Sequence, residues 1–324
     1  MTKSKADQEN QTGTTPEEQP LPAKEPDLST LQGLFSLFGP DANDEDLKAG
    51  IIKHVLLLAE KYSVAHYKLL LLYDDISDIS GWHSNRIYDG ATSGSSDRDI
   101  LLVIYSSGGR IEPAYLISKT CKRLAKNRFI VAVPRKAKSA ATLLALGADE
   151  IHMGFMSELG PIDPQIGGFP ALSMHNALKL LADLSCKYPG SSEMLGNYLA
   201  QKLDLRVLGY FERVGESAVQ YGERLLLGKE LPEGKTPNSL ANHFVNHYKD
   251  HGFVIDADEA TALLGTGIVK QKTNEYYFAN ALFSSLDLLK FLLEWKRKQE
   301  FDYVGSVEEG LTIRKKKERL SSNE

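Results

Sequence analysis

The sequence predicts an α/β fold in which the strands of a parallel sheet alternate with helices. The first observation is a set of apolar runs of strand length, over residues 68–73, 100–105 and 129–133. The second is a helical spacing of apolar residues after two of these runs, over 113–124 and 140–146. A further short strand is expected over 150–153. Strands that alternate with helices in this way run parallel and are joined by right-handed crossovers.

The two ends of the chain differ from this alternating part. Residues 1–27 are polar and poor in large apolar side chains, so they predict a disordered tail. Residues 28–275 are expected to form one domain, and residues 276–324 a C-terminal helix, over about 285–299, with a charged tail. The short apolar stretch 31–38 is expected to dock on the core rather than on a neighbouring subunit.

Most of the remaining chain is predicted to be helical. A helix is expected over 45–62, capped by Asn43 or Asp44 and apolar on one face. Residues 74–94 are polar and predict an irregular segment. Beyond the parallel strands, helices are expected over 173–187, 191–203, 205–226, 238–250 and 257–264.

Composition excludes several classes of function. The 324 residues allow a large core, and the formal net charge of −5 argues against electrostatic binding of nucleic acid. The two cysteines form no CxxC motif and suit a reducing compartment. The sequence shows no signal peptide and no run of about 18 apolar residues. We therefore expect a cytoplasmic protein that reaches a membrane only through a partner.

Two polar turns carry the candidate chemistry. Gly108-Gly109 follows the strand at 100–105, and glycines let a ligand approach backbone N–H groups that can hold an oxyanion. Ser139 opens the apolar helix after the next strand, where it is either an N-cap or a nucleophile. Because both turns fall at the carboxyl ends of consecutive strands, they are expected to face one crevice.

A nucleophilic serine needs a base, and the sequence leaves its identity open. Lys138 is adjacent to Ser139, so its side chain is expected to point away. A buried lysine can lose its proton near neutral pH, and Lys179 on a downstream helix is the first choice. The alternatives are Lys187, Lys202, Asp163, His247 and His251.

Three histidines recur at four-residue intervals and invite a metal interpretation. His243, His247 and His251 would share one face of a continuous helix. However, the sequence has no HExxH motif, and Gly252 ends the helix at once. We expect no metal and no cofactor.

The turns and their flanks resemble a known family. Residues 102–109 and 137–151 are similar to the serine dehydrogenase proteinases, a family of Clp-fold serine proteinases related to signal peptide peptidase A. The loop 158–165 resembles the same family, and the similarity extends over about 65–275. The resemblance implies a Clp-protease/crotonase-like superfold of repeated β-β-α units with a helical C-terminal part. It also implies a polypeptide substrate and a homo-oligomer.

The resemblance also implies roles for particular residues. Ser139 matches the nucleophile, while Gly109 and the N–H of Ala140 match the oxyanion hole. Relatives use either a lysine or a histidine completed by an aspartate as the base, and Asp163 stands where the Clp histidine is expected. The family usually has glycine where this chain has Ala141, which is expected to crowd the turn beside the nucleophile. It usually has proline at the position of Ser107.

The predicted function is therefore a serine peptidase that hydrolyses peptide bonds. The alternative is a catalytically weak or inactive Clp-fold scaffold that binds a partner as an oligomer. A third class is a crotonase-like acyl-CoA enzyme, which would bind a CoA thioester and leave Ser139 unexplained. Labelling by a fluorophosphonate separates the first class from the other two.

Overall fold

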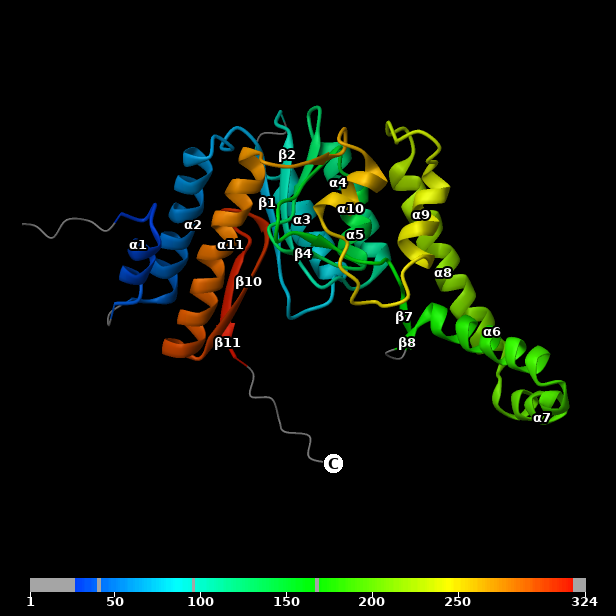
Figure 1. The fold of residues 1–324 in the computed structure, drawn as a ribbon. Helices are drawn as coiled ribbons and strands as arrows, with labels where there is room; N and C mark the ends of the chain where they lie inside the picture. Colours follow the sequence, from blue (N-terminus) through cyan, green and yellow to red (C-terminus); the bar gives the residue numbers. More distant parts are fainter. Residues whose placement is uncertain (1–26, 40–41, 95–96, 167–168, 317–324) are drawn as a thin grey trace, which may run out of the picture.

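A seven-stranded sheet forms the centre of the molecule in a computed structural model that describes residues 27–39, 42–94, 97–166 and 169–316 (Figure 1). The strand order is β11-β10-β1-β2-β3-β5-β9. Strands β1, β2, β3, β5 and β9 are parallel, whereas β10 is antiparallel to β1 and β11 to β10. Their bounds are Lys68–Tyr73 (β1), Ile100–Tyr105 (β2), Phe129–Ala132 (β3), Glu150–His152 (β5), Val269–Lys270 (β9), Gln299–Ser306 (β10) and Leu311–Lys315 (β11). The predicted α/β class is confirmed.

Helices cover both faces of this sheet (Figure 1). One face packs on α1 (Leu31–Ser36), α2 (Asp44–Lys61) and α11 (Asn274–Leu292). The other packs on α3 (Gly81–Thr92), α4 (Ile111–Leu124), α5 (Ala140–Leu146) and α10 (Ala257–Leu264). Since strand side chains alternate between faces, Leu70 and Leu72 enter one core and Leu69 and Leu71 the other. Leu34 of α1 is fully buried, so the stretch 31–38 docks on the core as expected.

A small parallel pair stands beside the main sheet. It consists of β4 (Lys136–Ala137) and β6 (Glu158–Leu159). A bridge between Ser106 and Ala137 joins this pair to the end of β2. The order β3, β4, α5 is thus one β-β-α unit, and it carries Ser139 between β4 and α5.

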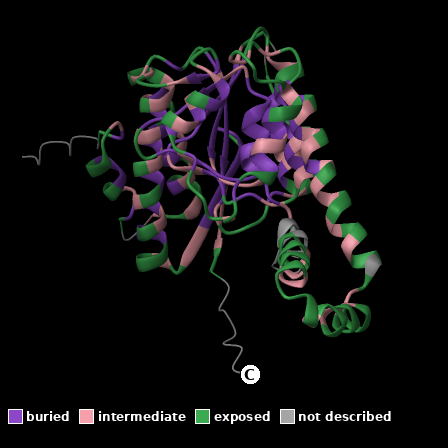
Figure 2. Ribbon diagram, turned by 45° about the vertical axis from the view of Figure 1, so that its right-hand side comes forward, coloured by how far each residue is buried: buried purple, intermediate pink, exposed green. Residues whose placement is uncertain are grey.

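A helical arm projects from the body on the side of β9 (Figure 1). It contains α6 (Ala171–Lys187), a 3-10 turn over Pro189–Ser191, α7 (Ser192–Lys202) and the first half of α8 (Leu205–Leu226). A short hairpin of β7 (Gln165–Ile166) and β8 (Phe169–Pro170) leads into it. The second half of α8 packs against α9 (Pro237–Asn246). Figure 2 shows that the far end of the arm is exposed.

Five boundaries or elements differ from the sequence predictions. Helix α3 lies in the segment that was expected to be irregular, and Ser80 with His83 forms its capping box. Helix α11 begins at Asn274 instead of near 285, and α9 ends at Asn246. Strands β10 and β11 follow α11 where only a helix and a charged tail were predicted. The prediction of a disordered tail falls, except for Asp27, outside the described residues.

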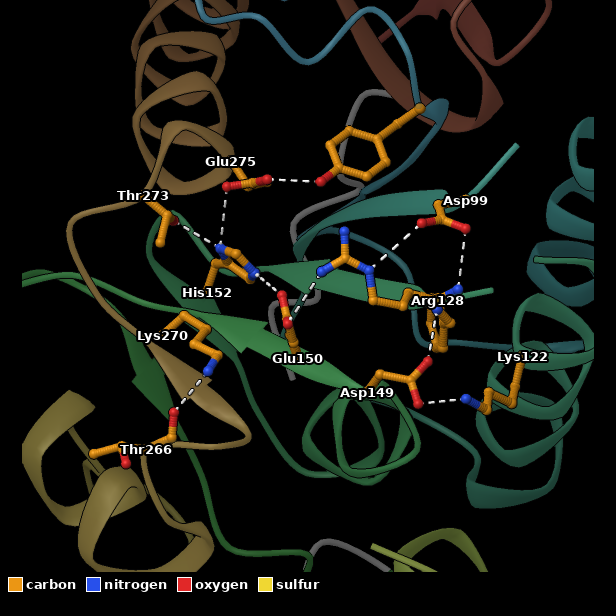
Figure 3. A network of polar contacts seen from close by, with 12 residues as sticks. Asp99, Lys122, Arg128, Asp149, Glu150, His152, Thr266, Lys270, Thr273 and Glu275 are labelled. Atoms are coloured by element: carbon orange, nitrogen blue, oxygen red, sulfur yellow. Dashed lines mark hydrogen bonds and ion pairs between the residues drawn. The ribbon is translucent and has the colours of Figure 1, made fainter. Parts of the chain in front are cut away.

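A partly exposed polar network ties the sheet to α11 (Figure 3). Arg128 contacts Asp99 at 3.5 Å and Glu150 at 3.2 Å. Glu150 in turn contacts His152, whose other ring nitrogen lies 2.6 Å from Oγ1 of Thr273. None of the predicted site residues belongs to this network, so we assign it a structural role. Among the described helices, none is both long and apolar enough to cross a membrane.

Candidate active site

Ser139 occupies a strained turn between β4 and α5. Its φ of 50° and ψ of −118° are rare for a residue with a side chain. The hydroxyl makes no capping hydrogen bond to α5, and the residue is only partly buried. Ser139 is therefore not the ordinary N-cap that its position allowed. Its side chain is left available for chemistry.

The turn is fixed by hydrogen bonds from its neighbours. Thr142 donates from Oγ1 to the carbonyl of Ala137 at 2.6 Å and accepts from the N–H of Gly160 at 3.0 Å. The N–H of Ala141 donates to the carbonyl of Lys138 at 2.8 Å, and Ala141 is fully buried. The turn thus accommodates Ala141 without losing its own hydrogen bond.

The Gly108-Gly109 turn touches the Ser139 turn. Gly108 has a φ of +108°, and a Cβ added there would lie 2.8 Å from the Cβ of Ser139 and 2.7 Å from the carbonyl oxygen of Lys138. Gly109 has a φ of +141° and packs as closely on Ile79. Only glycine allows both this backbone conformation and this approach. The two turns that were predicted to lie together are therefore in contact.

Two backbone N–H groups of these turns, those of Gly109 and Ala140, have no acceptor within the described residues. Ile79 bridges Gly109 by donating to the carbonyl of Gly108 at 2.8 Å and accepting from the N–H of Arg110 at 2.9 Å. In such a parallel bridge the N–H of Gly109 itself points to the opposite side of the strand. The N–H of Ala140 is the first of α5 and has no intrahelical partner. Among the described residues, neither group has an assigned acceptor.

The side chain of Lys138 points away from Ser139, as predicted. Its Nζ lies 2.9 Å from Oε2 of Glu158 and donates to the carbonyl of Phe253 at 3.0 Å. A bridge between Leu159 and Ile255 continues the same contact. Lys138 therefore fastens the loop 250–254 to the turn that carries the serine. We call this contact the Lys138 clamp.

The clamped loop brings His251 to Asp163. Their Nδ1 and Oδ2 atoms are 3.9 Å apart, and the side chain of Asp163 is 5% exposed. Nδ1 of His251 is buried and makes no hydrogen bond among the described residues. Burial, assisted by the charge of Lys138, holds the pKa of His251 below its usual value of 6.5. His251 is therefore neutral at pH 7 and able to accept a proton.

The lysines proposed as bases lie elsewhere. Lys179, Lys187 and Lys202 are exposed on the helical arm, so they lack the desolvation that makes lysine a base near neutral pH. Among the described residues, no contact joins Lys179 to Ser139. Lys229 was not among the predicted bases, and burial lowers its pKa to about 8. Its Nζ contacts the carbonyl of Ala148, beyond the C-terminal end of α5 and thus at the opposite end from Ser139.

The other two histidines stay on α9 or at its end. The rings of His243 and His247 stack with centroids 4.1 Å apart, while His251 leaves the helix direction because α9 ends at Asn246. Within the described parts of the chain, no three His, Cys, Asp or Glu residues are grouped as metal ligands.

Asp163 also lines an open cleft of about 720 Å³ between α6, α8 and α9, which we call the α8–α9 cleft. Lys179 lies in its wall, whereas Ser139 is not among its lining residues. The cleft thus begins beside the His251–Asp163 pair and extends along the helical arm. Its size is that of an ordinary ligand site.

The parallel sheet with helices on both faces, the β3-β4-α5 unit and the serine at the start of a buried helix define the class of this protein as α/β. Residues 75–183 match the family of ClpP-like SDH-type serine proteinases, and the resemblance stated above is confirmed over this segment. The segment includes Gly109, Ser139 and Asp163 but not His251.

Two curated relatives come from Methanocaldococcus jannaschii and are both uncharacterized. MJ0137 is 34% identical over 119 residues, which is 36% of this chain and 38% of that protein. MJ1495 is 40% identical over 81 residues, or 25% of this chain and 27% of that protein. The chain therefore matches well under half the length of each relative.

Two solved structures of the membrane-bound stomatin-specific protease 1510-N are also similar. A lysine-to-alanine mutant in complex with a substrate peptide has a TM-score of 0.41 at 15% identity, covering 65% of this chain and 78% of that one. A serine-to-alanine mutant has a TM-score of 0.42 at 15% identity, covering 66% and 85%.

Proposed function

We propose that this protein is a serine peptidase with Ser139 as its nucleophile. The observation that carries the proposal is the contact between the two turns. It brings a strained, uncapped serine against the glycine turn, and in the described part of the chain the N–H groups of Gly109 and Ala140 have no acceptor. An acyl-transfer site needs this pairing of a nucleophile with donors for the oxyanion. Membership of residues 75–183 in a serine proteinase family supports a peptide bond as the target.

His251 and Asp163 are the proposed base and its partner. Nδ1 of His251 faces Asp163, so Nε2 is the atom that would take the proton of Ser139. A carboxylate at this distance would stabilise, through its charge, the imidazolium that forms. The Lys138 clamp supports this assignment because it ties the histidine loop to the serine turn. Lys179 remains a prediction, with exposure as the argument against it.

The reaction then runs in two steps. Oγ of Ser139 attacks the substrate carbonyl while His251 takes the proton, and the N–H groups of Gly109 and Ala140 hold the oxyanion. The tetrahedral intermediate collapses as the protonated His251 gives its proton to the leaving amine. Water, deprotonated by His251, then attacks the acyl-enzyme. The second tetrahedral intermediate collapses as His251 returns the proton to Oγ of Ser139, which releases the acid and the free serine.

A fluorophosphonate probe followed by mass spectrometry tests the nucleophile. The wild type should be labelled on Ser139, and Ser139→Ala should lose both the label and the hydrolysis of denatured casein. Ser192→Ala is a matched control on the helical arm and should keep both. Labelling that persists in Ser139→Ala, or an unlabelled wild type, would refute the proposed nucleophile and favour the scaffold alternative. The homo-oligomer and the cytoplasmic location stay predictions.

A further inference from the structure

Three asparagines form a ladder along one wall of the α8–α9 cleft. Asn238, Asn242 and Asn246 recur every four residues on α9, and all three line the cleft. Nδ2 of Asn242 donates to Oδ1 of Asn238 at 3.1 Å, and Nδ2 of Asn246 donates to Oδ1 of Asn242 at 3.1 Å. We call this row the amide ladder. It presents a primary amide at each successive turn of the helix.

The spacing of the amide ladder matches that of an extended polypeptide. Four residues of an α-helix rise about 6 Å along its axis. Two residues of an extended chain advance about 6.6–6.8 Å, and they bring an N–H and a C=O back to the same side. A side-chain amide can donate to that C=O and accept from that N–H at once. Each rung can therefore pair with every second residue of a peptide laid along α9.

The amide ladder also leads toward the proposed catalytic residues. The N–H of Ile162 donates to the carbonyl of Phe244 at 2.8 Å, which puts Asp163 beside the C-terminal end of α9. Asn246 is the rung nearest that end. The opposite wall comes from α8 and mixes apolar side chains with carboxylates; the apolar ones are Leu208, Phe211 and Val219, and the acidic ones are Glu212, Glu216 and Glu223. An amide wall facing a wall of mixed apolar and acidic groups suits a chain whose main chain is bound by the amides and whose side chains, apolar or basic, face α8.

We propose that the amide ladder binds the main chain of an extended polypeptide and guides it to Ser139. The ladder's internal hydrogen bonds would be exchanged for bonds to the peptide backbone. Binding would then depend little on peptide sequence. The delivery to Ser139 rests on the proposed function, whereas the binding itself does not require catalysis.

The first test measures binding in the Ser139→Ala background, so that no peptide is cleaved. The probes are fluorescein-labelled decapeptides of unrelated sequence, followed by fluorescence anisotropy. Asn242→Ala should weaken all of them by a similar factor, about 5- to 30-fold, because up to two hydrogen bonds are lost. Alanine favours the helix, so the variant should fold. Asn197→Ala, an exposed asparagine of α7 outside the cleft, is the matched control and should bind normally.

The second test removes the donors from the peptide. Decapeptides N-methylated at alternate residues should bind the Ser139→Ala protein at least about fivefold more weakly than their parents in one of the two methylation registers. That difference should shrink in the Asn242→Ala variant. Gly215→Phe gives an independent check, because Gly215 lines the cleft and a Cβ there meets nothing within 4 Å. The added ring should block binding without disturbing the fold.

The outcomes separate this inference from the proposed function. Equal binding by Asn242→Ala and Asn197→Ala would overturn the amide ladder, as would an effect confined to one peptide sequence or no binding of any decapeptide. Fluorophosphonate labelling of Ser139 is measured separately in the wild type and in Asn197→Ala, and it should be the same in both. If Ser139 is labelled but peptide binding does not depend on the amide ladder, the peptidase proposal still holds. If binding depends on the ladder but Ser139 is not labelled, only the proposed catalysis is refuted.

Discussion

The Ser139 turn and the His251 loop would act together, yet they are held by different forces. Every residue of α5, which follows Ser139, is buried, and the turn is enclosed by the ends of two sheet strands. The loop 250–254 is mostly exposed and is attached by the Lys138 clamp and one bridge at Ile255. The position of the nucleophile is thus set by core packing. The position of the proposed base is set by a few polar contacts near the surface.

This difference predicts that changes in the loop affect activity, whereas changes in the turn affect folding. The largest effect is expected for His251→Ala, which removes the proposed base. Peptide hydrolysis should fall by about 10²- to 10⁴-fold, the usual share of general-base catalysis. The measurement is kcat/KM on denatured casein fragments, with thermal unfolding to show an intact fold.

His66→Ala is the matched control, since His66 is exposed and distant in sequence from the loop. It should hydrolyse peptides as the wild type does. A His251→Ala protein with wild-type kcat/KM would show that another group takes the proton and would bring the lysines back into consideration.

For the turn, Gly108→Ala should lower the stability of the folded protein. The new Cβ would lie under 3 Å from the Ser139 Cβ and the Lys138 carbonyl oxygen, in a backbone conformation that costs a side chain free energy. We expect the free energy of unfolding in urea to fall by about 2–3 kcal/mol. Gly196→Ala, with open space around its Cβ on α7, should leave stability equal or slightly higher. Equal stability of Gly108→Ala would contradict the close contact of the turns.

Lys138→Met tests the clamp that joins the two regions. Methionine keeps the aliphatic stem but loses the contacts with Glu158 and the Phe253 carbonyl. We expect kcat/KM to fall about tenfold, with a stability loss of about 1 kcal/mol, because the histidine loop is no longer fixed. Lys126→Met removes an exposed ion pair with Asp97 and serves as the control. An unchanged kcat/KM in Lys138→Met would show that fixing the loop 250–254 is not needed for the reaction.

The smallest expected effect is a pH dependence of stability. It comes from two buried histidines that belong neither to the Ser139 turn nor to the His251 loop. Burial lowers the pKa of His54 and of His152 below 6.5 in the folded protein. The unfolded chain therefore binds protons first as pH falls through 6.5, and stability present above that pH is lost below it. Between pH 7.5 and 5.5 each should cost about 1 kcal/mol in the free energy of unfolding. The free energy of unfolding of His152→Gln, measured by urea titration, should depend less steeply on pH than that of the wild type. An unchanged pH dependence would show that His152 does not contribute to it.

Much of the fold followed from local patterns. The strands at 68–73, 100–105 and 129–133 were predictable because each is a continuous apolar run buried on both sides of the sheet. Strand β10 was missed because it mixes Gln299, Glu300 and Asp302 with apolar residues, and it pairs with a strand more than 200 residues earlier. Asp302 is buried there because Arg314 on β11 neutralises it.

For the candidate site, the sequence by itself determined the two turns. Glycines directly after a buried strand and a serine opening an apolar helix are local signals, and parallel strands bring their ends together. The tertiary structure alone decided which side chains meet them. It pairs His251 with Asp163 across 88 residues of chain, and it aligns the amide ladder with the cleft beside that pair. Contacts between segments that are far apart in the sequence depend on how the helices pack, and the local periodicity of the sequence does not specify that packing.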